Sequence, residues 1–426
     1  MAQGALPGFR DFYPPDLADR AFIMHAWRDV ARRYAFVEYD GPPLEPLDLY
    51  TRKSGDEIVG QLYHFTDRGG REVALRPEMT PTFARMVAAR ANALRKPVRW
   101  FSVPQLFRYE RQQKGRLREH YQLNVDIVGE PDVTADAELL AAAIDIMRGV
   151  GLTAADVRAR VSDRRLLRAL LVHAGVTEAQ LPAAYAVVDK LEREPRNVAA
   201  RRLAEAGIDV ASIDRFFDIV RPATLEDLRS RFGAEPLVAE PLERLDRYLA
   251  CLDALGVREW VELDLSIVRG LAYYTGIVFE LFDRKGEFRA ICGGGRYDTL
   301  LESLGGVNLP ALGFGMGDVV LGELLRARAL MPSSAPRIDY WVAGDDESRQ
   351  PDVMRVAAAL RGRGRSVEYA LRPQTLSRQL KTAATAGAER AVILRGDDAE
   401  RGKATIRTLG DGSEALVTIA DWMAHA

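Results

Sequence analysis

The sequence predicts an α+β fold, in which an antiparallel sheet flanked by helices is interrupted by a helical insertion and followed by a small α/β domain. Short β-prone runs separated by turn residues occur before residue 130 and again after residue 260, without the spacing of βαβ repeats. The long stretch between them is rich in Ala, Leu, Arg and Glu and poor in β-branched and aromatic residues. After a short Pro/Ser segment, strand-like and helix-like segments alternate to the end.

Length and composition place the chain among multi-domain globular proteins. Its 426 residues exceed the roughly 150 of a typical domain, and its hydrophobic (47%) and charged (28%) fractions exclude a disordered or fibrous chain. No run approaches the roughly 18 apolar residues of a membrane helix, and residues 1–7 lack the basic start and apolar run of a secretory signal. We therefore expect a cytoplasmic protein without a membrane partner.

The first part of the sheet is expected within residues 7–165. An amphipathic helix is predicted at residues 15–33, before the Pro42-Pro43 pair that a helix interior does not tolerate, and it is a candidate for a core or a dimer interface. A second long helix is expected at residues 135–150. Between the two helices lie four short β-prone runs, at residues 62–65, 72–75, 98–103 and 123–128.

A helical insertion is expected at about residues 166–254. Its helical segments are broken at Gly175, Gly207 and Pro222. Two strands, a glycine turn and a helix are then predicted at residues 263–268, 277–282, 293–295 and 318–329. The sheet should therefore be interrupted by the insertion and completed after it.

A separate C-terminal domain is expected after the Pro/Ser segment at residues 331–336, which reads MPSSAP and is typical of a linker. The strand and helix segments beyond it lie at residues 338–343, 353–360, 367–371, 376–386 and 391–394. This alternation predicts an α/β domain at residues 337–426, separate from a larger domain at residues 1–330.

The charge balance limits which partners the whole molecule can attract. Its formal net charge is −2, from 59 basic and 61 acidic residues, so binding of nucleic acid would need a local basic patch. One candidate is residues 108–118, which contain four arginines and a lysine. A second, residues 355–365 with four arginines, is more typical of a solvated helix face.

Cysteine and histidine positions argue against a metal held by the protein. Cys251 and Cys292 are the two cysteines, and neither a CxxC nor a Cys/His spacing is present, so the sequence supports neither a zinc site nor a disulfide framework. None of the scattered histidines is a candidate ligand or catalytic group; they are His25, His64, His120, His173 and His425.

A carboxylate and a hydroxyl follow a strand-like run in the segment Arg76-Pro77-Glu78-Met79-Thr80. On a continued strand, Glu78 and Thr80 would point to one side, because side chains alternate between the two faces. A carboxylate placed there could bind a cationic amine or an imidazole. A turn with a threonine cap explains the segment equally well.

Residues 107–126 predict a hairpin with charged faces. Arg108 and Glu110 are two residues apart and share a face of the first strand, and Gln122 and Asp126 share a face of the returning strand. Arg116 lies in the tip, KGR. Such a hairpin offers guanidinium groups to a polyphosphate, beside an acid and an amide that can hold an ammonium group. Taken alone, a salt-bridged surface hairpin is the commoner explanation.

An arginine leaves an apolar strand in residues 265–276 (LSIVRGLAYYTG). Burying Arg269 alone would be costly, so it needs either an anionic partner or a route to solvent, and both remain open. Tyr273 and Tyr274 follow it. Residues 293–298 (GGGRYD) combine a glycine turn, which permits close approach of a ligand, with Tyr297, although the signal is weak without a Rossmann context.

Together these segments resemble those of the histidyl-tRNA synthetases, and the resemblance covers essentially the whole chain. RPEMT and FRYERQQKGR…HYQLNVD resemble the family's RPE-x-T element and class II motif 2, and VRGLAYYTG and CGGGRYD resemble its two histidine-specific motifs. The C-terminal domain resembles the family's anticodon-binding domain, and the class I signatures HIGH and KMSKS are absent. The resemblance implies a class II fold, histidine–tRNA ligase activity with ATP and Mg²⁺, a tRNA partner and a homodimer.

The resemblance also implies a role for individual residues. Arg269 and Arg108 would be catalytic, because they would stabilise negative charge on the α-phosphate without a side-chain nucleophile. Mg²⁺ would be held mainly by ATP and water. Contacts to ATP would come from Arg108, Glu110, Arg116 and Arg269. Contacts to histidine would come from Glu78, Thr80, Gln122, Asp126, Tyr273, Tyr274 and Tyr297.

Three departures from the family pattern are visible. Asp126 stands where many members have glutamate, Ala272 replaces an aspartate, and Val320 stands where motif 3 supplies an arginine for the γ-phosphate. Weaker ATP binding is the direct expectation from Val320. The alternative is a non-catalytic regulatory subunit of the ATP phosphoribosyltransferase of histidine biosynthesis, but such regulators generally lack the anticodon domain. A prolyl or threonyl synthetase is disfavoured by RGLAYY and GGGRYD.

Overall fold

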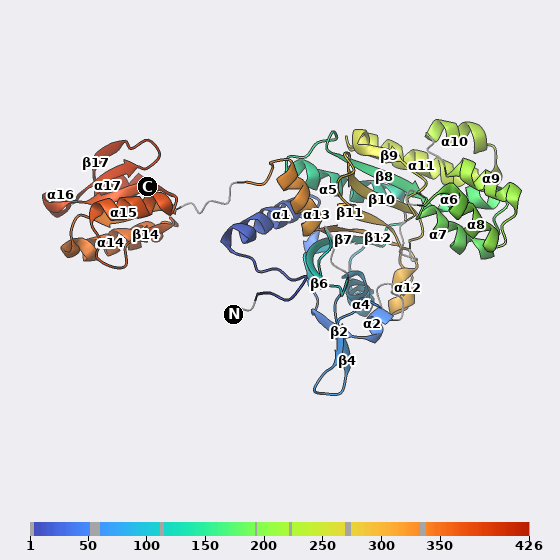
Figure 1. Ribbon diagram of the computed structural model, residues 1–426, viewed down its shortest axis with the longest axis horizontal. Coiled ribbons are helices and arrows are strands. Elements are labelled where there is room, and N and C mark those ends of the chain that lie inside the picture. The colour runs from blue at the N-terminus through green and yellow to red at the C-terminus, as the bar shows by residue number, and fades with distance from the viewer. Residues whose placement is uncertain are drawn as a thin grey trace. The chain divides into compact units, whose positions relative to one another are not determined.

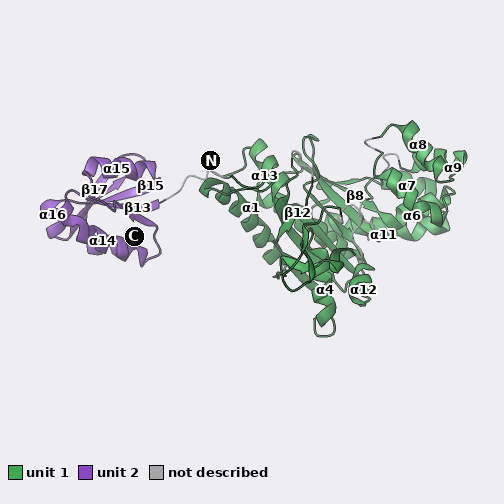
Figure 2. Cartoon of the chain, turned by 60° about the horizontal axis from the view of Figure 1, so that its bottom comes forward, with its two compact units in different colours: residues 1–332 green, residues 333–426 purple. Residues whose placement is uncertain are grey.

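The computed structural model describes residues 4–51, 60–110, 115–191, 194–220, 224–268, 274–332 and 338–425. The chain divides into two compact units, Met1–Pro332 and Ser333–Ala426 (Figure 2). Within these described ranges, no helix is long and apolar enough to cross a membrane.

A mixed sheet forms the centre of unit 1 (Figure 1). In the described part of the chain it has nine strands in the order β1-β5-β7-β12-β11-β10-β8-β9, with β6 paired to β7. Neighbours are antiparallel except for the pairs β1/β5 and β8/β9. The strands are β1 (Val37–Glu38), β5 (Val98–Ser102), β6 (Gln105–Phe107), β7 (Glu119–Val128), β8 (Val157–Asp163), β9 (Val261–Leu263), β10 (Ile277–Asp283), β11 (Cys292–Arg296) and β12 (Ala311–Gly317). The α+β prediction is confirmed.

One face of this sheet is apolar and covered by helices. On β7, the alternate residues Leu123, Val125 and Ile127 are buried in the main core. Helix α5 (Val133–Gly149) packs on β7, β11 and β12, and helices α1 (Pro14–Arg33) and α11 (Pro236–Ala254) pack on α5. Helix α13 (Asp318–Ala327) packs on α1. The opposite face, which carries Gln122 and Asp126, is therefore left for other elements.

Two short helices cover one end of that opposite face. Helices α4 (Thr80–Arg90) and α12 (Leu300–Gly305) pack on each other, on the side of the sheet away from α5 (Figure 1). Their apolar residues join Val98, Val128 and Val278 of the sheet in a second core, which also contains Tyr274 and Tyr297. A small sheet, β2-β4-β3, precedes α4; its strands are β2 (Leu44–Pro46), β3 (His64–Thr66) and β4 (Glu72–Leu75), with α2 (Asp48–Thr51) between β2 and β3.

Helices occupy the region between β8 and β9, where the sequence predicts a helical insertion. Gly175 and Gly207 lie just after α6 and α8 with φ of +99° and +80°, a backbone conformation that glycine adopts at helix ends. Pro222, the third predicted break, lies outside the described residues. The helices in the described part are α6 (Arg164–His173), α7 (Leu181–Val188), α8 (Arg196–Glu205), α9 (Val210–Ile219), α10 (Leu225–Phe232) and α11.

Two local predictions are wrong. Residues 263–268 do not form a strand: β9 ends at Leu263, and the Asp264 carboxylate accepts hydrogen bonds from Ser266 N (2.9 Å) and Oγ (2.6 Å), which turns the chain. The glycines at residues 293–295 form no turn but belong to β11, which is paired on both sides. A Cβ at Gly294 would lie 2.5 Å from Cβ of Phe314, so glycine is needed there for close strand packing.

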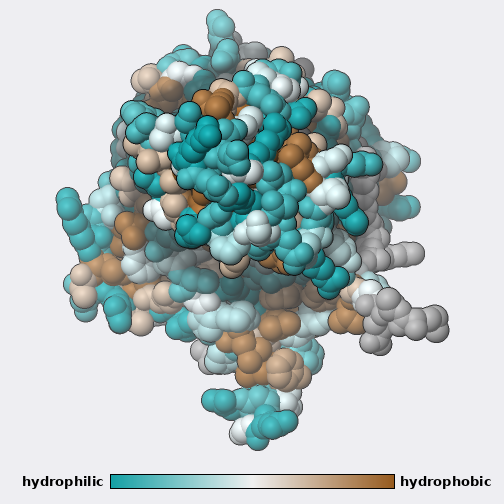
Figure 3. All heavy atoms as spheres, turned by 90° about the vertical axis from the view of Figure 1, so that its left-hand side faces the viewer, coloured by the Kyte–Doolittle hydropathy of each residue, from teal (hydrophilic) through white to brown (hydrophobic). Residues whose placement is uncertain are grey.

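Unit 2 has its own sheet, ordered β14-β13-β15-β16-β17. The first three strands are parallel and the last two antiparallel, an arrangement that the sequence did not predict. Its elements are β13 (Ile338–Gly344), α14 (Gln350–Arg361), β14 (Val367–Tyr369), α15 (Leu376–Thr385), β15 (Ala388–Leu394), α16 (Gly396–Glu400), β16 (Lys403–Thr408), β17 (Glu414–Thr418) and α17 (Ile419–His425). The side of this unit seen in Figure 3 is mainly hydrophilic.

Candidate functional site

The floor of the candidate site is a glycine-rich part of the open sheet face. The register pairs Asp126 of β7 with Gly313 of β12, and Gly313 in turn pairs with Gly295 of β11. A Cβ at Gly313 would collide with Oδ1 of Asp126, and a Cβ at Gly315 would lie 2.5 Å from Nε2 of Gln122. The side chains of Gln122 and Asp126 therefore extend over the β12 backbone, as their predicted common face requires.

Asp126 forms the acidic centre of a tyrosine-lined group. It is buried, and one carboxylate oxygen accepts a hydrogen bond from the Tyr297 hydroxyl. Burial raises the pKa of Asp126 to about 7, although the hydrogen bond from Tyr297 acts in the opposite direction. The ring of Tyr274 packs edge-on to Tyr297, with centroids 6.5 Å apart. Tyr273, the third predicted tyrosine, lies outside the described residues, as does Arg269.

Glu78 and Thr80 lie at a strand-to-helix junction and not on a continued strand, because β4 ends at Leu75 and α4 begins at Thr80. The alternation argument for these residues is therefore wrong, and the threonine cap is also absent, since α4 has no side-chain cap hydrogen bond in its described residues. The junction is held by Arg76, which donates to Gln105 O (3.0 Å), Gly41 O (2.7 Å) and the Asp40 carboxylate (2.8 Å). Glu78 is buried beside it.

Arg108, Glu110 and Arg116 form a charged group in the connection between β6 and β7; the prediction that Arg108 and Glu110 share a strand face is wrong, because β6 ends at Phe107. Arg116 makes an ion pair with the buried Glu110 carboxylate, and Nη1 of Arg108 is 4.0 Å from the same carboxylate. Nε of Arg108 donates to Pro77 O at 2.9 Å, which joins the hairpin to the junction after β4. Both arginine side chains remain partly exposed, so the hairpin is salt-bridged and can still present two cations. Residues 111–114 lie outside the described part.

A cavity of about 230 Å³ is lined by the charged group of the hairpin and by Gln122, whereas Asp126, Tyr274 and Tyr297 are not among its lining residues. One wall comes from the hairpin and the start of β7 and carries Arg108, Glu110, Arg116 and Gln122. The start of α13 supplies an apolar wall, Val319 and Val320. A Cβ at Gly115 would lie 3.5 Å from Val320, so the hairpin turn approaches this wall closely. Glu78 and Thr80 are not among the residues that line the cavity.

Sequence reasoning missed three residues of this cavity, Glu280, Arg289 and His120. Glu280 had a usable signal, because it is an acid in the apolar run IVFELF, and its register partner Gly293 lies on the open face. Arg289 lies in the β10–β11 connection, where the sequence gives no comparable signal. Burial and the charges of Arg108 and Arg10 lower the pKa of His120 to about 3, so this imidazole is neutral.

The arrangement can hold two kinds of ligand side by side. The buried acid and tyrosines suit an amine or imidazole, and the cationic cavity next to them suits a polyphosphate. No three His, Cys, Asp or Glu side chains are grouped as a metal site anywhere in the described ranges. The arginines and carboxylates of the site are suited to positioning reactants and to stabilising charge.

Comparison with known proteins gives matches along the whole chain. The family model described as histidyl-tRNA synthetase matches residues 8–317, and the anticodon binding domain matches residues 339–424. The histidine–tRNA ligase of Opitutus terrae is 46% identical over 97% of this chain and 95% of its own length. The chloroplastic/mitochondrial histidine–tRNA ligase of Arabidopsis thaliana is 41% identical, over 97% of this chain and 85% of that protein.

Solved structures share the fold at lower identity. A histidyl-tRNA synthetase from Nostoc sp. aligns with a TM-score of 0.85 at 23% identity, covering 100% of this chain and 99% of that one. A Bacillus halodurans protein, titled an ATP phosphoribosyltransferase regulatory subunit/histidyl-tRNA synthetase, aligns with a TM-score of 0.76 at 21% identity, covering 93% and 99%. The family match over residues 8–317 and the 46% identity decide the relationship: the chain belongs to the histidyl-tRNA synthetase family.

Proposed function

We propose that this protein is a histidine–tRNA ligase, which forms histidyl-adenylate from histidine and ATP and then transfers histidine to its tRNA. The observation that carries the proposal is the acidic, tyrosine-lined group around Asp126 beside the cavity of Arg108 and Arg116. Full-length identity to histidine–tRNA ligases of a bacterium and a plant supports the same activity.

Histidine would bind over the glycine floor of the sheet. Asp126, which accepts a hydrogen bond from Tyr297, would recognise an imidazole N–H, and Glu78 and Gln122 would hold the α-amino group. Thr80, Tyr273 and Tyr274 complete the proposed histidine contacts, the last because its ring packs on Tyr297. The family resemblance and the chemistry of these side chains support this assignment.

ATP would bind in the adjoining cavity, with Arg108 and Arg116 on its phosphates and Glu110 towards its adenosine end. In the first step, an oxygen of the histidine carboxylate bonds to the α-phosphorus, and the bond to pyrophosphate breaks. Arg108 and Arg269 would stabilise the negative charge that develops there. Arg289 adds a further cation to the cavity lining from the β10–β11 connection.

Mg²⁺ would accompany ATP and would neutralise part of the charge of the phosphates. Glu110 and Glu280 are the carboxylates that line the cavity, and Glu110 is already paired with Arg116. The protein would therefore contribute few ligands, and the ion would be held mainly by phosphate oxygens and water. We further propose a cytoplasmic homodimer, as the family resemblance implies.

The regulatory-subunit alternative is less well supported. Its structural relative shares the fold at 21% identity, which carries no functional information by itself. Residues 339–424 match an anticodon binding domain, a module that serves a ligase directly.

The test is histidine-dependent exchange of pyrophosphate into ATP by the purified protein. We expect exchange with histidine and not with the other amino acids, because Asp126 would make its hydrogen bond to an imidazole N–H that the other side chains lack. A folded protein that binds histidine but shows no exchange would contradict the proposal and favour the regulator.

A further inference from the structure

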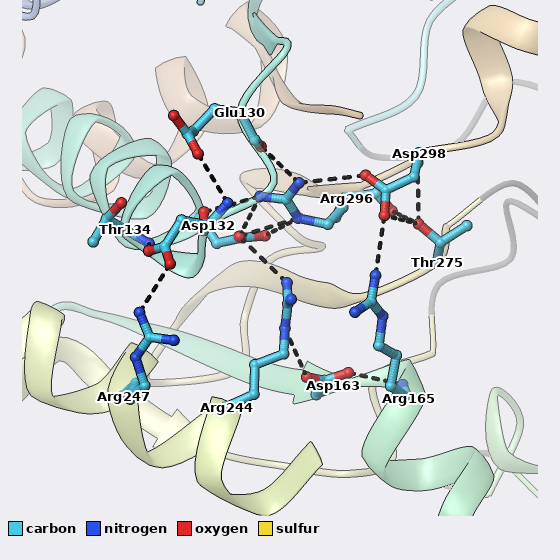
Figure 4. Close-up of polar contacts among 11 residues, drawn as sticks. Glu130, Asp132, Thr134, Asp163, Arg165, Arg244, Arg247, Thr275, Arg296 and Asp298 are labelled. Atoms are coloured by element: carbon cyan, nitrogen blue, oxygen red, sulfur yellow. Dashed lines mark hydrogen bonds and ion pairs between the residues drawn. The ribbon is translucent and has the colours of Figure 1, made fainter. Parts of the chain in front are cut away.

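A buried ion pair involves Arg296, the residue that directly precedes Tyr297, and Figure 4 shows the polar contacts around Arg296. Arg296, the last residue of β11, donates to the Asp136 carboxylate through Nη2 (2.6 Å) and Nε (3.0 Å). It also donates to the backbone oxygens of Glu130 (2.9 Å) and Asp132 (3.2 Å), just before α5. Arg296 and Asp136 are 1% and 2% exposed, so this pair fixes β11 to the start of α5.

Thr275 and Asp298 connect this pair to the backbone next to the two pocket tyrosines, Tyr274 and Tyr297. Arg296 precedes Tyr297 in the sequence, and Thr275 follows Tyr274. Thr275 N donates to Arg296 O at 2.7 Å, and the Thr275 hydroxyl donates to Asp298 at 3.1 Å. Nη1 of Arg296 also donates to Asp298 at 3.3 Å. The positions of both tyrosines therefore depend on Asp298 and its partners.

The helical segment α6 to α11 supplies the outer partners of this group. Arg165, in the first turn of α6, donates to the Asp298 carboxylate at 3.2 Å. Arg244 of α11 lies between two buried acids, with Nη2 3.7 Å from Asp136 and Nε 3.8 Å from Asp163. Asp163 in turn caps α6 by accepting from Arg165 N at 2.7 Å. Figure 4 shows these side chains converging from α5, α6, α11 and β11.

The buried charges of this group restrict how α6 and α11 can pack. Asp136 and Asp163 are buried, and burial raises the pKa of each carboxyl because it disfavours the charged form. Their arginine partners offset this cost only in a defined geometry. A movement of α6 or α11 would therefore disturb Asp298 and Asp136 together and would reach the backbone next to Tyr274 and Tyr297.

We propose that Arg165 and Arg244 are positioning residues for histidine, through which the helical segment holds the pocket tyrosines in place. The inference rests on the proposed function, because it assigns Tyr274 and Tyr297 to the histidine site. Neither arginine is placed against ATP, so their loss should affect histidine far more than ATP.

The test compares R165M with a matched control, R168M. Arg168 lies about one turn later on α6 and pairs with Glu178 on the surface. In pyrophosphate exchange, R165M should raise the KM for histidine on the order of tenfold with the KM for ATP unchanged, because small misplacements of a binding group are costly. R168M should match the wild type. R165K, which keeps the cation, should recover most of the affinity for histidine.

R244M provides a second, more buried position, and a melting curve shows whether it has folded. If it unfolds, R165M decides the question, since the Arg165 side chain is 41% exposed and its partner Asp298 is 23% exposed. Equal KM values for histidine in wild type, R165M and R168M would overturn the inference, as would equal rises for histidine and ATP. Absence of histidine-dependent exchange in the wild type would contradict the proposed function instead.

Discussion

Asp126 combines burial with a pKa near neutrality, which is uncommon for a carboxyl group. Its contact with Tyr297 keeps one oxygen in a fixed direction, and the glycine at position 313 leaves room for that oxygen. Burial disfavours its charged form and raises its pKa to about 7, so the residue changes charge within the physiological range. A ligand N–H at the other oxygen would favour the ionised form.

This pKa predicts a pH-dependent affinity for histidine. Below pH 7 Asp126 of the free protein is mostly protonated and is a weak acceptor for an imidazole N–H, whereas above pH 7 it is mostly ionised and a strong, charge-assisted acceptor. The KM for histidine is measured for D126N and for the wild type at each pH. The D126N value divided by the wild-type value should increase from pH 6 to pH 8 and then level off. Titration of histidine itself cancels in this ratio, so a ratio independent of pH would contradict the account.

Arg289 and Val320 both line the cavity proposed to bind ATP, and they affect how much positive charge it carries. The hairpin wall carries two cations and the shared carboxylate of Glu110, and the wall at the start of α13 is apolar. Arg289, in the β10–β11 connection, supplies a further cation to the lining of this cavity. The weaker ATP binding expected from Val320 would then be offset.

We predict that R289A raises the KM for ATP by about 10- to 100-fold, because a charged hydrogen bond is worth about 1.5–3 kcal/mol. V320R in the R289A background should recover part of this loss by placing a cation on the wall formed by the start of α13. The control is R284A, an exposed arginine of the same β10–β11 connection that donates to Ala154 O. An unchanged KM for ATP in R289A would remove Arg289 from the phosphate site.

At the scale of secondary-structure elements, strand β12 shows how the sheet makes room for a ligand. Its glycines alternate with Leu312, Phe314 and Met316, which are buried in the main core. Every second position thus lacks a side chain on the open face, and Gln122 and Asp126 of β7 occupy the space. One face of β12 therefore packs in the helix-covered core, and its other face forms the floor of the candidate site.

Alanine substitutions in β12 should separate binding from folding. A Cβ at Gly315 meets the flexible end of Gln122, so G315A should raise the KM for histidine about tenfold with little change in Tm. A Cβ at Gly313 would lie 2.7 Å from the backbone oxygen of Val125, so G313A should destabilise the fold by about 1–3 kcal/mol. G317A meets nothing within 4 Å and serves as the stability control. A G313A variant as stable as G317A would contradict this reading of the strand.

The elements found from the sequence are those with a strong local pattern. Helix α1 and strands β4 and β10 lie within one residue of the predicted bounds, because periodic burial and nearby turn residues mark them. Strand β11 was missed because three glycines have low strand propensity, and only the neighbouring strands of the sheet stabilise them there. Strand β8 was missed too, since VRARVSD carries two arginines, one of which pairs with Asp264.

In the candidate site, too, a local sequence pattern predicts some positions and misses those that depend on distant contacts. Gln122 and Asp126 were placed on one face of a strand correctly, because alternation is a local rule. The directions of Glu78 and Thr80 are not predicted correctly. They depend on contacts of Arg76 with Asp40 and Gln105, two residues that lie far from Arg76 in the sequence. Arg289 and Glu280 join the cavity only through the pairing of β10 with β11.

At the scale of the whole molecule, the two units have separate cores. The apolar clusters of unit 1 contain residues up to Met331, and those of unit 2 begin at Ile338. The described residues proposed to contact histidine or ATP all lie in unit 1. Unit 1 can therefore activate histidine, and unit 2 can recognise tRNA.

A chain that ends at residue 332 should fold and should keep histidine-dependent pyrophosphate exchange within about a few-fold, because its core is complete. Charging of tRNA should fall much more, since binding energy from a remote contact helps to position the acceptor end. A melting curve confirms folding. Full charging activity in this variant would contradict the anticodon role proposed for unit 2.

The most direct test of the account is aminoacylation of tRNA by the full-length protein with labelled histidine. The account predicts that label from histidine, and from no other amino acid, becomes attached to tRNA in the presence of ATP and Mg²⁺, and that D126N needs a much higher concentration of histidine. A folded protein that binds histidine and ATP but leaves tRNA uncharged would contradict it.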